Sequence, residues 1–422
     1  MTGATYPLSY LQRIMSSYEA LLNATPLRIA FELRGDVDIE RLERSCLAVI
    51  NRHPALRMRL IREEAGVQRI LPPLGEAGCL QRHEVASQDL RREVDARSSR
   101  PLDLYEEGPI RFSLFTDDMA GTLILVVAVH HIASDIYGNQ QIGIDLWRAY
   151  SDDATSLSDP GATFLDYIAQ EQASDEPLTS AQRSHLLDTF PKAIALSGHG
   201  NESVGHDIQS FSGVESLSGG PLAEFAESAR VTKPIAAMTL LVGALSAATG
   251  ESDFPCAVIF HGRMRPADRE VVGLMLRHVY FRTGLEPCST YSEAAGVLYQ
   301  RWLEAVRLST PMYVATDFLE LIGGTLPPRL VLSDGTASAQ AASEMGGIEV
   351  TSLELSPLDL RQYTLPDSLS LLYGVDDCVH LMGGYDRASF SDKVVGRFID
   401  VLELIRECDA QELLRSPLNR PW

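Results

Sequence analysis

Apolar and polar residues follow two different periods along the first part of the chain, and these periods predict strands and helices in turn. Residues 27–33 alternate at every second position, as in a half-buried strand. Residues 38–50 place apolar side chains at helical spacing behind an acidic first turn, which predicts an amphipathic helix. Residues 122–129 form a continuous apolar, β-branched run, which indicates a central strand buried on both faces.

The rest of the chain shows the same mixture of periods. Further strands are predicted at 66–72, 109–116, 255–260, 329–333, 368–372 and 378–382, and further helices at 139–150, 180–196, 235–249, 292–307 and 389–407. The small, polar residues 151–162 are interrupted by Pro-Gly, as in a surface linker, and the polar, Gly-rich residues 197–220 predict a loop. We therefore expect an α/β protein of two similar lobes, residues 1–160 and 161–422, joined near residues 155–180.

Composition narrows the class of protein further. The 422 residues are 45% apolar, enough for substantial cores, and the formal charge of -21 disfavours binding to nucleic acid or anionic lipid. The six cysteines are scattered without a C-x-x-C pair, which favours reduced, mostly structural thiols. Neither a signal-peptide pattern nor an apolar run of membrane-spanning length is present, so we expect a soluble, cytoplasmic protein without nucleic-acid or membrane partners.

One motif stands out as a candidate for chemistry. A His-His-x-x-x-Asp string, with His130, His131 and Asp135, directly follows the predicted central strand. Exits of strands are where α/β folds tend to place functional groups. A neutral imidazole can remove a proton from an amine or an alcohol at neutral pH, which makes His131 the candidate general base. His130 precedes it on an extended segment and is expected to point the other way and support the backbone.

This string resembles the HHxxxDG signature of the condensation-domain superfamily of non-ribosomal peptide synthesis. Other segments agree with it: residues 51–57 resemble the family's RHxxLR motif, residues 164–169 its YxDFAxW motif, and residues 262–275 its GRxxP and VGxF motifs. The resemblance covers nearly the whole chain. It implies a chloramphenicol-acetyltransferase-like fold, in which two α+β two-layer sandwiches form a V-shaped pseudo-dimer with His131 in a tunnel between them.

The resemblance also implies a reaction, the transfer of an acyl or aminoacyl group from a carrier-protein thioester to an amine or hydroxyl acceptor. In such an enzyme Asp135 would pair with Arg263 and stabilise the turn that directs His131, since a buried carboxylate requires a partner. Backbone N–H groups at the start of the following helix, those of Ile136, Tyr137 and Gly138, would hold the oxyanion.

Several positions leave more than one interpretation open. Ile136 replaces the glycine of the motif, a change that would narrow the tunnel, and the later HQxxPFE and RDxSRNP patterns are absent. His278 and Tyr280 either line the tunnel or belong to a core. Arg52, His53 and Arg57 either complement the dipole at a helix C-terminus or support the site from beneath; all three lie within residues 51–57.

The expected partners follow from the reaction. We expect no metal and no bound cofactor, because the sequence lacks ligand clusters and a phosphate-binding Gly-rich loop; the donor's phosphopantetheine arm is part of the substrate. The donor would arrive on an acyl or peptidyl carrier protein, and the acceptor would be a small molecule or a second carrier protein. The arginines of residues 91–100 are a candidate docking patch or a solvated helix face.

We expect a free-standing condensation enzyme of natural-product biosynthesis, with amide or ester as the product. Direct transfer is favoured over a covalent acyl-enzyme, because no G-x-S-x-G nucleophile turn occurs. Two alternatives remain open: an acyltransferase that takes its donor from coenzyme A, and a catalytically silent condensation-like module that recruits a partner enzyme.

Overall fold

A computed structural model of the chain forms two compact units. It describes residues 3–62, 64–75, 78–119, 121–152, 157–173, 178–190, 206–309, 328–335, 343–357, 359–375 and 378–418. The first unit comprises residues 1–174, 261–276 and 337–358, and the second unit comprises residues 175–260, 277–336 and 359–422. The division differs from the expected one after residue 160, because two later segments belong to the first unit.

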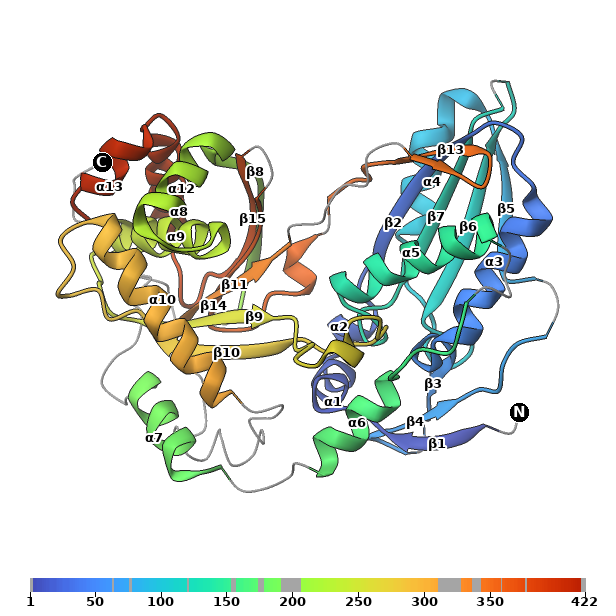
Figure 1. The fold of residues 1–422 in the computed structure, drawn as a ribbon, viewed down its shortest axis with the longest axis horizontal. Helices are drawn as coiled ribbons and strands as arrows, with labels where there is room; N and C mark the ends of the chain where they lie inside the picture. Colours follow the sequence, from blue (N-terminus) through green and yellow to red (C-terminus); the bar gives the residue numbers. More distant parts are fainter. Residues whose placement is uncertain are drawn as a thin grey trace. The chain divides into compact units, whose positions relative to one another are not determined.

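The first unit is built on a six-stranded sheet of order β12-β13-β2-β7-β6-β5 (Figure 1). The strands are β2 (Leu27–Arg34), β5 (Leu80–Val85), β6 (Ile110–Asp117), β7 (Leu123–Val129), β12 (Ser343–Met345) and β13 (Ile348–Ser352). Neighbouring strands pair antiparallel except β5 and β6, which are parallel. The hairpin of β12 and β13 explains why residues 337–358 belong to this unit, since β13 pairs with β2.

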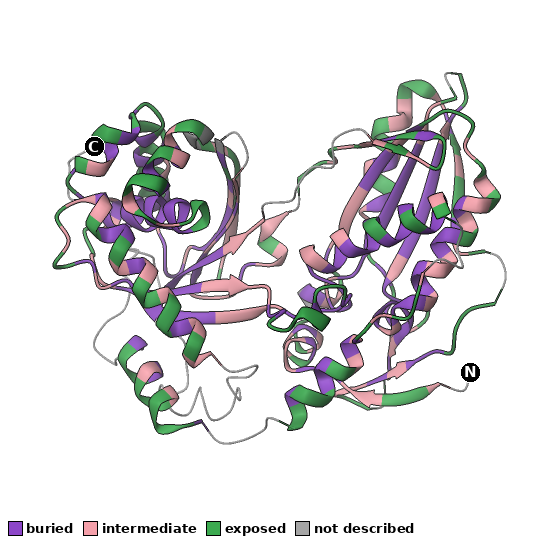
Figure 2. Ribbon diagram, viewed as in Figure 1, coloured by how far each residue is buried: buried purple, intermediate pink, exposed green. Residues whose placement is uncertain are grey.

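Helices cover both faces of this sheet, and the apolar run of β7 is divided between them. Leu125, Val127 and Val129 pack with α3 (Ile39–Arg52) and α5 (Ile136–Asp152), whereas Ile124 and Val126 pack on the side of α4 (Leu90–Ser98). Successive side chains of a strand point to opposite faces, so a strand between two helical layers is apolar throughout. Figure 2 shows that β7 is buried along most of its length.

A smaller sheet of order β1-β4-β3 completes the strands of the first unit. Its strands are β1 (Ala4–Pro7), β3 (Met58–Leu60) and β4 (Val67–Ile70), and the same unit contains helices α1 (Tyr10–Ser17), α2 (Glu19–Leu22) and α6 (Phe164–Ala173). A capping box begins α1: the Ser9 hydroxyl accepts from Gln12 N–H, and the Gln12 side chain accepts from Ser9 N–H.

The second unit contains another six-stranded sheet, of order β10-β9-β11-β14-β15-β8. Its strands are β8 (Ile208–Ser218), β9 (Pro255–Phe260), β10 (Arg277–Arg282), β11 (Arg329–Asp334), β14 (Ser368–Val375) and β15 (Cys378–Asp386). Strand β11 runs parallel to β9 and β14, and the other pairs are antiparallel. Helices and strands are mixed along this part of the chain, as the sequence predicts, although β9 is followed by β10 and β14 by β15 without an α-helix between them.

The large core of the second unit lies between its sheet and a layer of helices. These helices are α8 (Gly219–Ala229), α9 (Lys233–Thr249), α10 (Tyr291–Leu308), α12 (Asp392–Arg406) and α13 (Ala410–Arg415). Most residues of α9 are buried, which fits its nearly all-apolar sequence (Figure 2). The opposite face of the sheet packs with α7 (Ser180–Thr189) through a smaller cluster that includes Leu186 and Tyr280.

The structure confirms most predicted elements and corrects a few. The helix expected over 180–196 ends at Thr189, because the residue before Pro191 is disfavoured in a helix; residues 191–196 lie outside the described part. The loop expected over 197–220 contains strand β8 in its described part, from residue 208. Strand β10 and the hairpin of β12 and β13 are not anticipated by the sequence pattern.

Over the described residues, no single helix is both long and apolar enough to cross a bilayer. A pair of consecutive helices, residues 220–229 and 233–249, is long and apolar enough when the two are taken together, by length and composition only. The pair is bent by 96° at the break between the helices.

Candidate active site

His131 lies in the turn between β7 and α5, half-exposed. Its Nδ1 lies 2.7 Å from the backbone oxygen of Ser134. A carbonyl oxygen can only accept, so Nδ1 carries the proton, and in the neutral ring the lone pair is on Nε2. The turn thus fixes the tautomer as well as the direction of the ring, and it assigns the basic nitrogen to Nε2.

His130 is buried and uses both ring nitrogens on the backbone. Its Nδ1 accepts from Ile132 N–H at 3.1 Å, and its Nε2 lies 3.1 Å from the carbonyl oxygen of Leu22, to which it donates. Burial lowers the pKa of His130 to about 4, so this ring is neutral at neutral pH. These contacts are those of a residue that supports the turn.

Asp135 is the N-cap of α5 and is completely buried. Its two carboxylate oxygens form a bidentate ion pair with Arg263, with both distances 2.9 Å. Two backbone N–H groups also donate to it, from Gly138 at 2.8 Å and from Met275 at 3.0 Å. The pair implied by the resemblance is therefore present, and Arg263 belongs to the same compact unit as Asp135, not to the other lobe.

Two glycines allow the close packing around this carboxylate. A Cβ atom on Gly138 would lie 2.5 Å from the Ser134 hydroxyl oxygen, and one on Gly273 would lie 2.3 Å from the Phe164 ring. Gly273 is the glycine of the VGxF-like segment. A larger residue at this position would collide with Phe164, so the glycine is needed for close packing. The N–H of Gly138 is donated to Asp135, which removes it from the oxyanion donors expected from the sequence.

The segment that carries Arg263 also surrounds Tyr137. The Arg263 guanidinium lies 5.6 Å from the centre of the Tyr137 ring, and the ring of His261 lies 5.1 Å from it, centre to centre. His261 Nδ1 accepts from Arg263 N–H at 3.0 Å. Tyr137 and Ile136 are both half-exposed in the first turn of α5, where their roles as oxyanion or tunnel groups stay predictions.

A second buried carboxylate, Asp145, lies further along α5. Arg52 contacts one oxygen at 2.5 Å, His53 Nε2 lies 2.7 Å from the other, and Gln141 donates at 2.9 Å. Arg52 also pairs with Glu270 at 2.7 Å. Burial lowers the pKa of His53. The contacts show a structural role for the start of the RHxxLR-like segment.

Arg57, the last residue of that segment, is also buried. Its guanidinium donates to the backbone oxygens of Ile50, Asn51 and Leu71. The three contacts join the end of α3 to the chain after β4, so Arg57 too is engaged in holding the first unit together.

His278 and Tyr280 belong to β10 of the second unit, and their rings stack at 5.9 Å. Burial lowers the pKa of His278, and the charge of Arg329 lowers it further. Tyr280 packs against Phe190, and its backbone oxygen lies 2.8 Å from His185 Nε2. They lie in a different compact unit from His131, so their part in a tunnel stays a prediction.

The arginines near α4 are paired with acidic neighbours. Arg97 pairs with Glu93 at 2.9 Å within α4, and Arg92 pairs at 3.0 Å with Asp89, the residue before the helix. Further pairs join Arg91 to Asp95 at 3.8 Å and Arg100 to Glu107 at 3.4 Å. This arrangement favours the solvated helix face over a basic docking patch.

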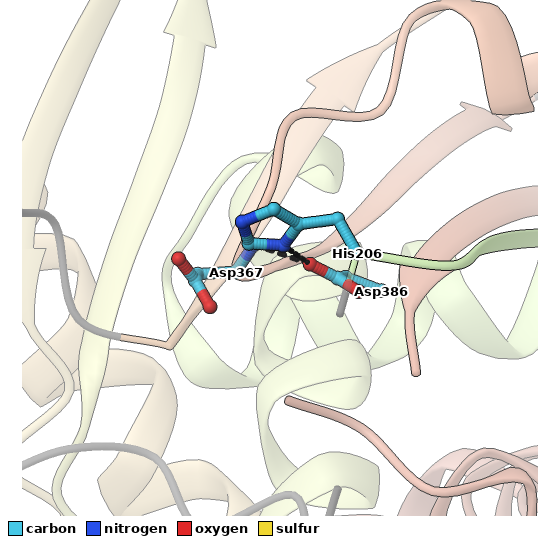
Figure 3. Close-up of side chains that lie close together, drawn as sticks. All are labelled: His206, Asp367 and Asp386. Atoms are coloured by element: carbon cyan, nitrogen blue, oxygen red, sulfur yellow. Dashed lines mark hydrogen bonds and ion pairs between the residues drawn. The ribbon is translucent and has the colours of Figure 1, made fainter. Parts of the chain in front are cut away.

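One group of side chains in the described residues has the composition of a metal site (Figure 3). Ligand atoms of His206, Asp367 and Asp386 lie within 4.8 Å of one another. Asp386 is buried, and it accepts hydrogen bonds from His206, at 2.6 Å, and from the N–H groups of Asp207, Asp367 and Ala388. These hydrogen bonds give Asp386 a structural role at the end of β15.

Sequence reasoning missed one buried polar residue beside the turn. Gln12 is completely buried, and its amide donates to the backbone oxygen of Ile132 at 3.1 Å. The Ser-x-x-Gln spacing from Ser9 to Gln12 is the signature of a capping box and could have marked it.

The comparison with known proteins identifies the family. The model of the condensation domain matches residues 3–321, and the chain belongs to this family. It is 25% identical over 319 residues to bacitracin synthase 2 of Bacillus licheniformis, a match that covers 72% of this chain and 12% of that protein. The chain thus spans about an eighth of the length of this relative.

Solved structures agree with the fold. SgcC5 protein from Streptomyces globisporus superposes with a TM-score of 0.77 at 20% identity, over 98% of this chain and 100% of that one. The X-domain from teicoplanin biosynthesis, solved as a complex with OxyB, has a TM-score of 0.72 at 18% identity, over 100% and 96% of the two chains. The predicted two-lobe, chloramphenicol-acetyltransferase-like fold class is confirmed.

Proposed function

We propose that the chain is an acyltransferase that moves an acyl or aminoacyl group from a carrier-protein phosphopantetheine thioester to an amine or hydroxyl acceptor. The condensation-domain family supports a condensation-type acyl transfer in non-ribosomal peptide and polyketide biosynthesis. In this proposal the donor is bound to a carrier protein, and the acceptor is a small molecule or is bound to a second carrier protein.

The observation that carries it is the geometry of His131. Its Nδ1–H is engaged with Ser134 O, so Nε2 is the nitrogen that can accept a proton on a half-exposed ring. In the proposed reaction Nε2 takes the proton of the acceptor's N–H or O–H group as that atom attacks the thioester carbonyl. The new carbon–nitrogen or carbon–oxygen bond forms, and a tetrahedral oxyanion results.

Collapse of this intermediate breaks the carbon–sulfur bond. The proton held on His131 then passes to the leaving thiolate, which returns the imidazole to its neutral state and releases free phosphopantetheine thiol. The N–H of Ile136, at the positive end of α5, is the proposed oxyanion donor. Asp135 and Arg263 keep the turn in place and take no part in the proton transfer.

The test is intact-mass spectrometry of an acyl-loaded carrier protein, incubated with a panel of amines and alcohols. The wild type is expected to remove the acyl mass and to form an acylated acceptor, and His131→Ala is expected to lose about 100-fold to 10,000-fold in rate with an unchanged unfolding transition. His380→Ala, which removes an exposed histidine of the second unit, is the matched control and is expected to retain the rate. An equal rate for wild type and His131→Ala would overturn the proposal.

The same assay separates the alternatives. A saturable rate with free acyl-CoA that equals the rate with the loaded carrier would point to coenzyme A as the donor. Stable capture of a partner enzyme, together with product formation that His131→Ala leaves unchanged, would support the recruitment module.

A further inference from the structure

Two buried glutamines form an amide pair beneath the His131 turn. Gln12, from α1, and Gln68, from β4, are both completely buried. Gln68 Nε2 donates to Gln12 Oε1 at 3.0 Å and to the backbone oxygen of Pro7 at 3.0 Å. Burying two primary amides is costly unless their groups are paired, so each contact of this pair matters to the fold.

The network fixes which way the Gln12 amide points. Its Oε1 accepts from the backbone N–H of Ser9 at 2.9 Å, and a backbone N–H can only donate. Its Nε2 lies 3.1 Å from the carbonyl oxygen of Ile132, which can only accept. A flipped amide would oppose oxygen to oxygen, so the nitrogen of Gln12 faces the turn.

The carbonyl group that Gln12 holds belongs to Ile132, the residue after His131. Ile132 also donates its N–H to His130 Nδ1. The His131 ring donates to the backbone oxygen of Ser134, which lies two residues after Ile132. Gln12 is therefore one of the groups that determine where the peptide between Ile132 and Ala133 lies. A shift of this peptide would move Ser134 O relative to the imidazole, and with it the direction of Nε2.

We propose that Gln12 is a positioning residue for His131: through its hydrogen bond to Ile132 O it holds the turn in the conformation that directs Nε2 towards the acceptor. This inference rests on the proposed acyl transfer for its effect on rate, and on the structure alone for its effect on the ring. A misplacement of about 1 Å can cost about 100-fold in rate, so the loss of one remote hydrogen bond is expected to be visible.

The experiment compares Gln12→Met with Gln68→Met. Both changes replace a buried amide by an apolar chain of similar length and break the same amide pair, but only Gln12 has a hydrogen bond to the turn in the structure. We expect Gln12→Met to lower kcat about 10-fold to 100-fold with little change in KM, and Gln68→Met to lower kcat less than about threefold. Gln12→Glu is the second variant, because a protonated carboxyl can still donate to Ile132 O and an ionised one cannot. Its rate relative to wild type should fall as pH rises.

A readout independent of turnover is the ¹⁵N NMR spectrum of the imidazole rings, with His131 assigned by its loss in His131→Ala. Gln12→Met should reduce the population of the Nδ1–H tautomer of His131, and Gln68→Met should leave it as in the wild type. If the wild type transfers no acyl group while the tautomer shifts as expected, the proposed function fails and the positioning role stands. Equal losses of kcat, or equal spectra, for the two methionine variants would overturn the positioning role.

Discussion

The first unit contains two buried carboxylates at one helix: Asp135 caps the N-terminus of α5, Asp145 lies within it, and they are held in different ways. Asp135 is bound by Arg263 and by two backbone N–H groups from separate segments, whereas the three groups bound to Asp145 are the side chains of Arg52, His53 and Gln141. The backbone of the His131 turn thus depends directly on Asp135. Asp145 joins α5 to Arg52 at the end of α3 and to His53, the C-cap of α3, whose imidazole can titrate.

The largest effect is expected for Asp135→Ala. The change leaves the Arg263 charge and two backbone N–H groups buried without their acceptor, which should lower the free energy of unfolding by about 3–5 kcal/mol. Urea unfolding followed by circular dichroism measures it. Arg263→Ala should cost less, because both backbone donors still hold the carboxylate; the opposite ranking would contradict the account given for Asp135.

Asp145→Ala should have a smaller effect, about 2–3 kcal/mol in the same unfolding experiment. Arg52 keeps its second partner, Glu270, at 2.7 Å, and no backbone donor of the His131 turn binds Asp145 in the described part of the chain. The folded variant should retain its kcat in acyl transfer, unlike Asp135→Ala. A loss of kcat larger than that of Asp135→Ala would show that the two carboxylates are not separate in function.

Gly138→Ala tests how tightly the Asp135 cap is packed. A Cβ atom would lie 2.5 Å from the Ser134 hydroxyl oxygen, and the overpacking should cost about 1–3 kcal/mol. The double variant with Ser134→Ala removes the hydroxyl and should recover part of this loss in a double-mutant cycle. Additive effects of the two changes would locate the strain elsewhere.

The smallest effect is a change in how stability depends on pH. It is expected for the Asp145 network, which contains His53, and not for the Asp135 network. Burial lowers the pKa of His53, so this group favours folding fully above its unfolded pKa of about 6.5 and loses that contribution as pH falls below it. His53→Gln retains a donor for Asp145 and should give a flatter unfolding free energy below pH ~6.5, by at most about 1.4 kcal/mol per pH unit. Identical pH slopes for wild type and variant would remove His53 from the titrating groups.

The sequence predicts those parts of the fold whose pattern is local. The run of β7 and the amphipathic helix α3 are found where their periods indicate. Strand β8 is missed, because its polar and Gly-containing sequence matches an edge strand that pairs with β15 alone in the described sheet, with irregular register. The hairpin of β12 and β13 is missed because its partner, β2, is distant in sequence.

In the candidate site, too, the sequence predicts the residues with a local signal and misses a contact between distant segments. His131 is marked by the strand before it and by the motif, and the resemblance supplied Arg263 as the partner of Asp135. The contact of Gln12 with Ile132 joins the first helix to a turn far along the chain, and the capping-box spacing marks Gln12 at a helix start but not as a partner of Ile132. Spacing along the chain contains no information about such a contact, so it could be found only from the structure.

The hairpin of β12 and β13 has a consequence for how the chain is made. Strand β7 ends at Val129, but the strand that covers the free side of β2 begins at Ile348. While the polypeptide emerges from the ribosome, β2 is therefore an open sheet edge, able to pair with other nascent chains, and its closure requires a loop that is long and slow to form. The first unit is begun early in translation, and its sheet reaches full width only after residue 352 has been synthesised.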